Sequence, residues 1–100
     1  YGHIGFIDDL INHGANVNTQ NFYHETPLHF AAQNNHPKTI RRLLSSGAMI
    51  DKKTRTGHTP LHYAASMNHY ASIKLLLEHG SNQNALTLSR ETAKMLSDNI

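Results

Sequence analysis

The strongest constraint on this chain is a heptapeptide that returns after 33 residues. Residues 26–32 read Thr-Pro-Leu-His-Phe-Ala-Ala, and residues 59–65 read Thr-Pro-Leu-His-Tyr-Ala-Ala. A further 33 residues along, residues 92–96 carry a degraded copy, Thr-Ala-Lys-Met-Leu. A fixed period of this length is typical of stacked supersecondary units, each of which buries a narrow apolar face against its neighbours. We therefore expect a repeat array rather than a fold around one central core.

Each period predicts two helices. A threonine cap followed by proline at the first helical position starts a short helix, whose leucine and alanines form one apolar face. A second stripe of isoleucine and leucine at helical spacing follows, and it ends at a glycine suited to terminate a helix. These glycines are also 33 residues apart, at Gly14, Gly47 and Gly80. The polar stretch after each glycine has the composition of turns and short extended segments.

The phase of the repeat divides the 100 residues. It predicts the second helix of a partial repeat at 1–14, whole repeats at 15–47 and 48–80, and a partial C-terminal repeat at 81–100. The first helix would expose Ile4, Phe6, Ile7 and Leu10 without a partner helix, so we expect further repeats to precede Tyr1. Lys94 stands where the earlier units carry leucine, which leaves open whether the array ends near residue 100.

The chain resembles the ankyrin repeat family over essentially its whole length. The resemblance rests on the phrase at 26–32 and 59–65, on the loop phrases at 14–18 and 47–51, and on Gly2-His3 with Leu10 and Ile11. It implies an all-α ankyrin-repeat solenoid of helix–turn–helix units with projecting β-hairpin loops. It also implies that partners bind in a concave groove lined by the hairpin tips and by the links after the short helices.

The candidate partner-binding residues are the positions in those tips and links that differ between units. Exposed aromatic rings and arginines are typical interface anchors. Packing of Phe22 or Tyr23 against the neighbouring hairpin is the alternative for those two rings. Carried over position by position, the candidates are Phe22, Tyr23, Glu25, Gln33, Asn34, Arg55, Thr56, His58, Ser66, Met67, Leu88, Ser89 and Glu91.

Two of the three tips lack the glycine that the turn favours. His24 and Arg90 stand at the position of Gly57, so we expect a strained or altered backbone at both.

Nine histidines suggest a metal site, but the repeat accounts for most of them. The rings of His29 and His62 are expected to hydrogen-bond to the helix cap and to nearby backbone. Five others belong to the start or the end of the second helices: His3, His36, His69, His13 and His79. His24 and His58 remain, and His58 need not share a face with His62. Without cysteine or three converging ligands, no metal or other cofactor is expected.

The sequence does not indicate an enzyme. It has no glycine-rich phosphate loop, no nucleophile elbow and no zinc-hydrolase motif, and its seven carboxylates are scattered. A formal charge of +2 is too small to indicate a nucleic-acid or membrane partner. One basic segment, with Asp51 as its only carboxylate, suits either an acidic protein partner or a solvated face: Lys38, Arg41, Arg42, Lys52, Lys53 and Arg55.

The function expected from these features is a protein–protein interaction module, monomeric within a larger intracellular (cytoplasmic or nuclear) chain. One alternative is a structural spacer that positions another domain of a parent protein. Another is a host-directed effector of a virus or intracellular bacterium, secreted into a host cell. The resemblance also makes Asn18 a candidate for the hydroxylation known for ankyrin loop asparagines. The alternative for Asn18 is that it only braces its turn.

Overall fold

The structure is a computed structural model that describes residues 4–14, 16–85, 87 and 89–96, with side chains from residue 7 onward. The described residues form six helices and no strand. The helices are α1 (Ile4–Asn12), α2 (Pro27–Gln33), α3 (Pro37–Ser45), α4 (Pro60–Ser66), α5 (Tyr70–Glu78) and α6 (Ala93–Leu96).

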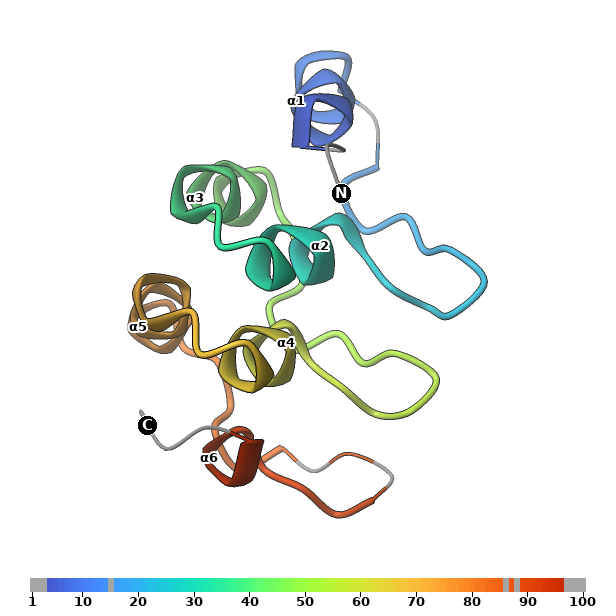
Figure 1. Cartoon of the computed structure of the whole chain (residues 1–100). Coiled ribbons are helices and arrows are strands. Elements are labelled where there is room, and N and C mark those ends of the chain that lie inside the picture. The colour runs from blue at the N-terminus through green and yellow to red at the C-terminus, as the bar shows by residue number, and fades with distance from the viewer. Residues whose placement is uncertain (1–3, 15, 86, 88, 97–100) are drawn as a thin grey trace.

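The helices stack in two layers (Figure 1). In the inner layer α2 packs on α4 and α4 packs on α6, while in the outer layer α1 packs on α3 and α3 packs on α5. Three connecting loops project from the side of the inner helices, as Figure 1 shows. We call them loop 1 (residues 13–26), loop 2 (residues 46–59) and loop 3 (residues 79–92). The predicted all-α solenoid is confirmed.

Hydrogen bonds between main-chain groups close the tips of the three loops. The N–H groups of Asn21, Thr54 and Thr87 donate to the carbonyl oxygens four residues later, over 3.1, 2.9 and 3.0 Å. The predicted hairpins are therefore closed turns in the described residues, rather than paired strands.

The starts of the inner helices follow from the repeated phrase. Thr26 and Thr59 have extended backbone conformations, and Pro27 and Pro60 are the first helical residues. Proline fits there because its missing N–H would have no partner in the first turn of a helix.

The outer helices end as predicted. Gly47 and Gly80 have φ angles of 95° and 93°, a conformation that only glycine adopts without a Cβ clash. Asn35 and Asn68, in the links between inner and outer helices, also have positive φ angles, of 57° and 56°. Asparagine tolerates this conformation better than most residues.

The core lies between the two layers. Eleven of its side chains are at most 1% exposed: Leu28, Ala31, Ala32, Ile40, Leu43, Leu61, Ala64, Ala65, Ile73, Leu76 and Ala93. The alanines allow neighbouring helices to approach closely, and each buried leucine or isoleucine contributes about 2 kcal/mol from apolar burial.

One expectation about the N-terminal end is wrong. Ile7 was expected to be exposed, but only 2% of it is accessible, because α1 packs on both α2 and α3. Leu10 is half-buried. The expectations for the side chains of Ile4 and Phe6 lie outside the described residues.

The loop tips show the expected backbone strain. His24 and Arg90 both have φ angles of 62°, close to the 82° of Gly57. The turns thus keep the glycine geometry without the glycine, at a cost of roughly 1 kcal/mol each.

We expect His24→Gly and Arg90→Gly each to raise the free energy of unfolding by up to about 1 kcal/mol, since glycine removes the Cβ clash. Urea denaturation measures the change. The matched control is Gly57→Ala, which should lower the free energy of unfolding by about 1 kcal/mol. No gain in either glycine variant would show that the tips are not strained.

Candidate functional site

A small open cavity lies between loops 1 and 2, next to the inner helices. It has a volume of about 330 Å³ and is lined by Tyr23, Glu25, Thr54, Arg55, Thr56 and Tyr63. Four of these six residues are predicted partner-binding positions, from two successive repeats. We call this space the inter-loop cavity.

Arg55 joins the two loops. Its Nε donates to the carbonyl oxygen of Phe22 over 2.6 Å, and its main-chain N–H donates to that of Tyr23 over 3.0 Å. The guanidinium carbon lies 5.1 Å from the centroid of the Phe22 ring, within the range of a cation–π contact. Phe22 therefore contacts the neighbouring loop and still remains 76% exposed.

Glu25 forms the opposite wall of the cavity. Its Oε2 accepts a hydrogen bond of 2.5 Å from the hydroxyl of Tyr63, and its Oε1 accepts one of 2.8 Å from Asn21 Nδ2. Burial raises the pKa of Tyr63, and the hydrogen bond to Glu25 and the charge of Glu25 act in the same direction. The hydroxyl therefore stays protonated and holds Glu25 in place.

Sequence reasoning missed Tyr63. It occupies the variable position of the repeated phrase, where the preceding unit has Phe30 and the following one Leu96. Variation at this position inside an otherwise constant phrase was the signal that could have identified it.

Buried histidines position the loops beside the inner helices. His29 Nδ1 accepts from the main-chain N–H of Thr26 over 3.1 Å, and its Nε2 donates to the carbonyl oxygen of His58 over 2.9 Å. His62 does the same with Thr59 (3.0 Å) and Glu91 (2.9 Å). The expectation that these rings bond to the cap and to nearby backbone is confirmed.

These contacts require neutral rings that carry their proton on Nε2. Burial lowers the pKa of His29 from 6.5 to about 4, although the hydrogen bond to the His58 carbonyl acts in the opposite direction. Burial also lowers the pKa of His62.

The other predicted positions in the links have local roles. Asn34 Nδ2 donates to the carbonyl oxygen of Phe30 over 2.8 Å, and Ser66 Oγ donates to that of Tyr63 over 3.1 Å. The main-chain oxygen of Gln33 accepts from His69 Nε2 over 2.8 Å. Met67, at the end of α4, is 51% exposed.

The tips of loops 2 and 3 hold the remaining candidates. Thr56 Oγ1 lies 2.8 Å from His58 Nδ1, and the His58 and His62 rings are 5.6 Å apart between centroids. Ser89 is exposed and Glu91 is half-buried, whereas Leu88 lies outside the described residues.

The basic segment is interrupted at Arg42. Its two η nitrogens bond to Asp8 Oδ1 over 2.7 Å and to Asn12 Oδ1 over 2.8 Å, which ties α3 to α1. Lys38 and Arg41 are exposed on α3. The segment therefore does not form one continuous basic patch.

Asn18 bridges two repeats. Its Nδ2 donates to the carbonyl oxygen of Gly47 over 3.1 Å, and its Oδ1 accepts from the N–H of Met49 over 2.7 Å. Asn18 thus braces the start of loop 2. Its hydroxylation stays a prediction.

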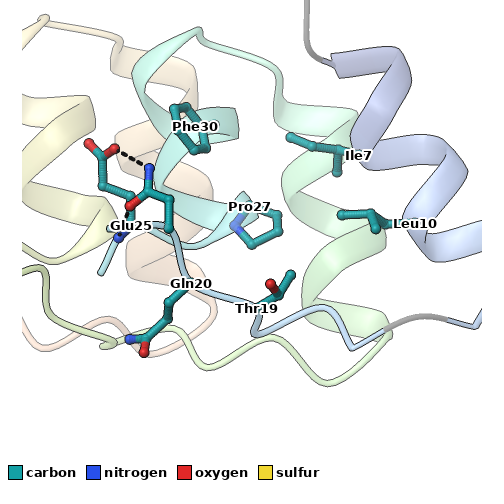
Figure 2. Close-up of a pocket in the computed structure, with 8 residues that line it drawn as sticks. Ile7, Leu10, Thr19, Gln20, Glu25, Pro27 and Phe30 are labelled. Atoms are coloured by element: carbon teal, nitrogen blue, oxygen red, sulfur yellow. Dashed lines mark hydrogen bonds between the residues drawn. The ribbon is translucent and has the colours of Figure 1, made fainter. Parts of the chain in front are cut away.

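A second pocket, of about 300 Å³, lies between α1 and α2 (Figure 2). Ile7 and Leu10 point from α1 toward Pro27 and Phe30 of α2, as Figure 2 shows. One period later, Leu43 stands at the position of the half-buried Leu10 and is fully buried, because α2 packs beside α3 and α4. The pocket therefore lies at the position that α2 occupies one period later. That further repeats precede Tyr1 stays a prediction.

The described residues contain no group of three or more histidine, aspartate or glutamate side chains placed to hold a metal ion. Within the same part of the chain, no helix has the length and apolar character needed to cross a membrane.

A protein-family model described as ankyrin repeats (3 copies) matches residues 1–87. A search of curated proteins gave no significant match.

We expect the protein to lose stability in acid because of His29. Its pKa is lower in the folded state than in the unfolded state, so the unfolded chain binds more protons below pH 6.5. The free energy of unfolding should therefore fall as the pH drops from about 6.5 to about 4, with His29 alone contributing about 3 kcal/mol.

Urea denaturation at several pH values in this range measures the loss. Burial also lowers the pKa of His62, so the matched control is His29→Gln, which should show a shallower decline. Parallel declines in the two proteins would show that His29 is not held neutral.

Proposed function

Because the chain belongs to the ankyrin-repeat family, whose members generally act as protein–protein interaction modules, we propose that it binds a partner protein across the inter-loop cavity. The surface consists of the tips of loops 1 and 2 together with the exposed end of α4. The partner is a protein segment, and the interaction needs no catalytic step, in keeping with a typically non-enzymatic family.

The observation that carries this proposal is the pair of exposed rings on loop 1. Phe22 and Tyr23 are 76% and 63% exposed, and their centroids lie 5.4 Å apart in an edge-to-face arrangement. Aromatic residues are enriched among the few that contribute most of the binding energy at protein–protein interfaces.

The backbone that carries these rings is also hydrogen-bonded before a partner arrives. Arg55 fixes the backbone at both Phe22 and Tyr23, as described above. Groups that are already ordered lose less conformational entropy on binding, so more of the contact energy appears as affinity.

The remaining predicted residues fit around these anchors. Met67 offers a flexible apolar side chain, which adapts to the shape of a partner. The polar positions of loops 1 and 2 and of the links supply a rim for hydrogen bonds: Glu25, Gln33, Asn34, Thr56, His58 and Ser66. On loop 3, Leu88, Ser89 and Glu91 stay sequence-based candidates.

We expect the double variant Tyr23→Ala/Arg55→Ala to weaken partner binding at least about tenfold, because it removes one ring and the side chain that orders its neighbour. The measurement is affinity purification with the immobilised protein, followed by titration of the recovered partner against each variant.

The control is Tyr70→Ala/Lys74→Ala, which removes an exposed ring and a cation from the outer helix α5. This pair should leave binding unchanged. If only the control pair abolishes binding, the partner uses the outer face. If neither pair has an effect, the proposal is wrong and a spacer role is favoured.

A further inference from the structure

The guanidinium of Arg55 is held in one orientation, but only one of its side-chain nitrogens donates a hydrogen bond. Its Nε is occupied by the carbonyl oxygen of Phe22, and one face of the group lies over the Phe22 ring. Arginine has four further N–H donors on its two η nitrogens. With the other described residues these nitrogens form no hydrogen bond or ion pair, although Arg55 is exposed at the cavity.

The nearby carboxylate of Glu25 does not pair with Arg55. Glu25 lines the same cavity, but its two oxygens accept hydrogen bonds from Tyr63 and Asn21. The one ion pair between described side chains is that of Arg42 with Asp8, on the outer helices. Arg55 therefore forms no ion pair with a described carboxylate, and its η nitrogens remain available to a ligand.

Two lysines close to Arg55 in the sequence add positive charge to loop 2. Lys52, Lys53 and Arg55 fall within four consecutive residues, and residues 52–58 contain no acidic residue. A cluster of charges of one sign attracts a ligand group of the opposite sign.

Two features of Arg55 favour a carboxylate ligand: its side chain is already restrained, and its guanidinium is planar. A free arginine loses considerable rotamer entropy when it forms a paired contact, but Arg55 is already held at Nε and by the Phe22 ring. The fork of a guanidinium matches the two oxygens of a carboxylate, and such paired hydrogen bonds are among the strongest that side chains form.

We propose that Arg55 receives an aspartate or glutamate side chain of the partner segment, next to an apolar residue that packs on Phe22 and Tyr23. This inference rests on the proposed function and specifies the partner: an acidic and apolar peptide segment. A lysine or arginine of the partner fits less well, because Arg55 repels a second cation.

An unbiased peptide selection tests the inference. The probe is a phage-displayed library of random linear 12-residue peptides, selected on the immobilised protein. We expect the enriched peptides to share an acidic residue beside an apolar one. Fluorescence anisotropy then measures their affinity for the wild type, Arg55→Gln, Arg55→Lys and the exposed control Arg41→Gln.

Arg55→Gln should weaken binding at least about tenfold, Arg55→Lys by less, and Arg41→Gln not at all. Replacing the acidic residue of the peptide by its amide should cause a similar loss with the wild type. With Arg55→Gln the same replacement should have little further effect. This coupling separates contact with the carboxylate from a role of Arg55 in holding loop 1, which would leave the two changes additive.

Two results would overturn the inference and leave the proposed function standing. In one, the peptides lose affinity on Tyr23→Ala but share no acidic residue, or share a basic one. In the other, the acidic residue and Arg55 are uncoupled. If no peptide is enriched, or if every enriched peptide tolerates Tyr23→Ala, both the inference and the proposed function are wrong.

Discussion

Each of the two whole repeats depends on one buried neutral imidazole. His29 and His62 each accept a hydrogen bond from the N–H of a helix-capping threonine and donate one to the carbonyl oxygen of a loop residue 29 positions later. A buried ring with an unpaired nitrogen would cost 1–3 kcal/mol, so satisfying both nitrogens restricts the ring to one tautomer and one orientation. The start of an inner helix is thereby tied to the next loop.

The inter-loop cavity depends on this restraint. Because loop 2 is held to α2 through His29, Arg55 lies beside loop 1 and can contact Phe22. Tyr63 likewise reaches back from α4 to Glu25 of the preceding repeat. The constant residues of the repeat thus set the distance between loops, while the variable residues at the tips determine the chemistry of the surface between them.

Local patterns made most of the fold predictable. Thr-Pro starts, glycine ends and apolar spacing each act within a few residues of chain, and the 33-residue period repeats them in phase. The strained positions His24 and Arg90 could be predicted because Gly57 showed what the equivalent turn requires.

Contacts between repeats were harder to predict, because they depend on where side chains meet in space. The Tyr63–Glu25 hydrogen bond spans 38 residues, and the Arg42–Asp8 ion pair spans 34. The burial of Ile7 similarly depends on how α1 packs across its neighbours. The phase of the repeat identified Phe22, Tyr23, Glu25 and Arg55 as loop-tip residues. It did not show that Arg55 hydrogen-bonds to the backbone of loop 1.

Amide hydrogen exchange in the His29→Ala variant tests most directly whether the imidazole holds the loop. Protection of the Thr54, Arg55 and Gly57 amides, which form the hydrogen bonds of loop 2, should fall at least about tenfold. The Thr87 and Arg90 amides of loop 3, which His62 supports, should keep their protection. Unchanged protection in loop 2, or an equal loss in both loops, would contradict a specific role for His29 in positioning loop 2 at the inter-loop cavity.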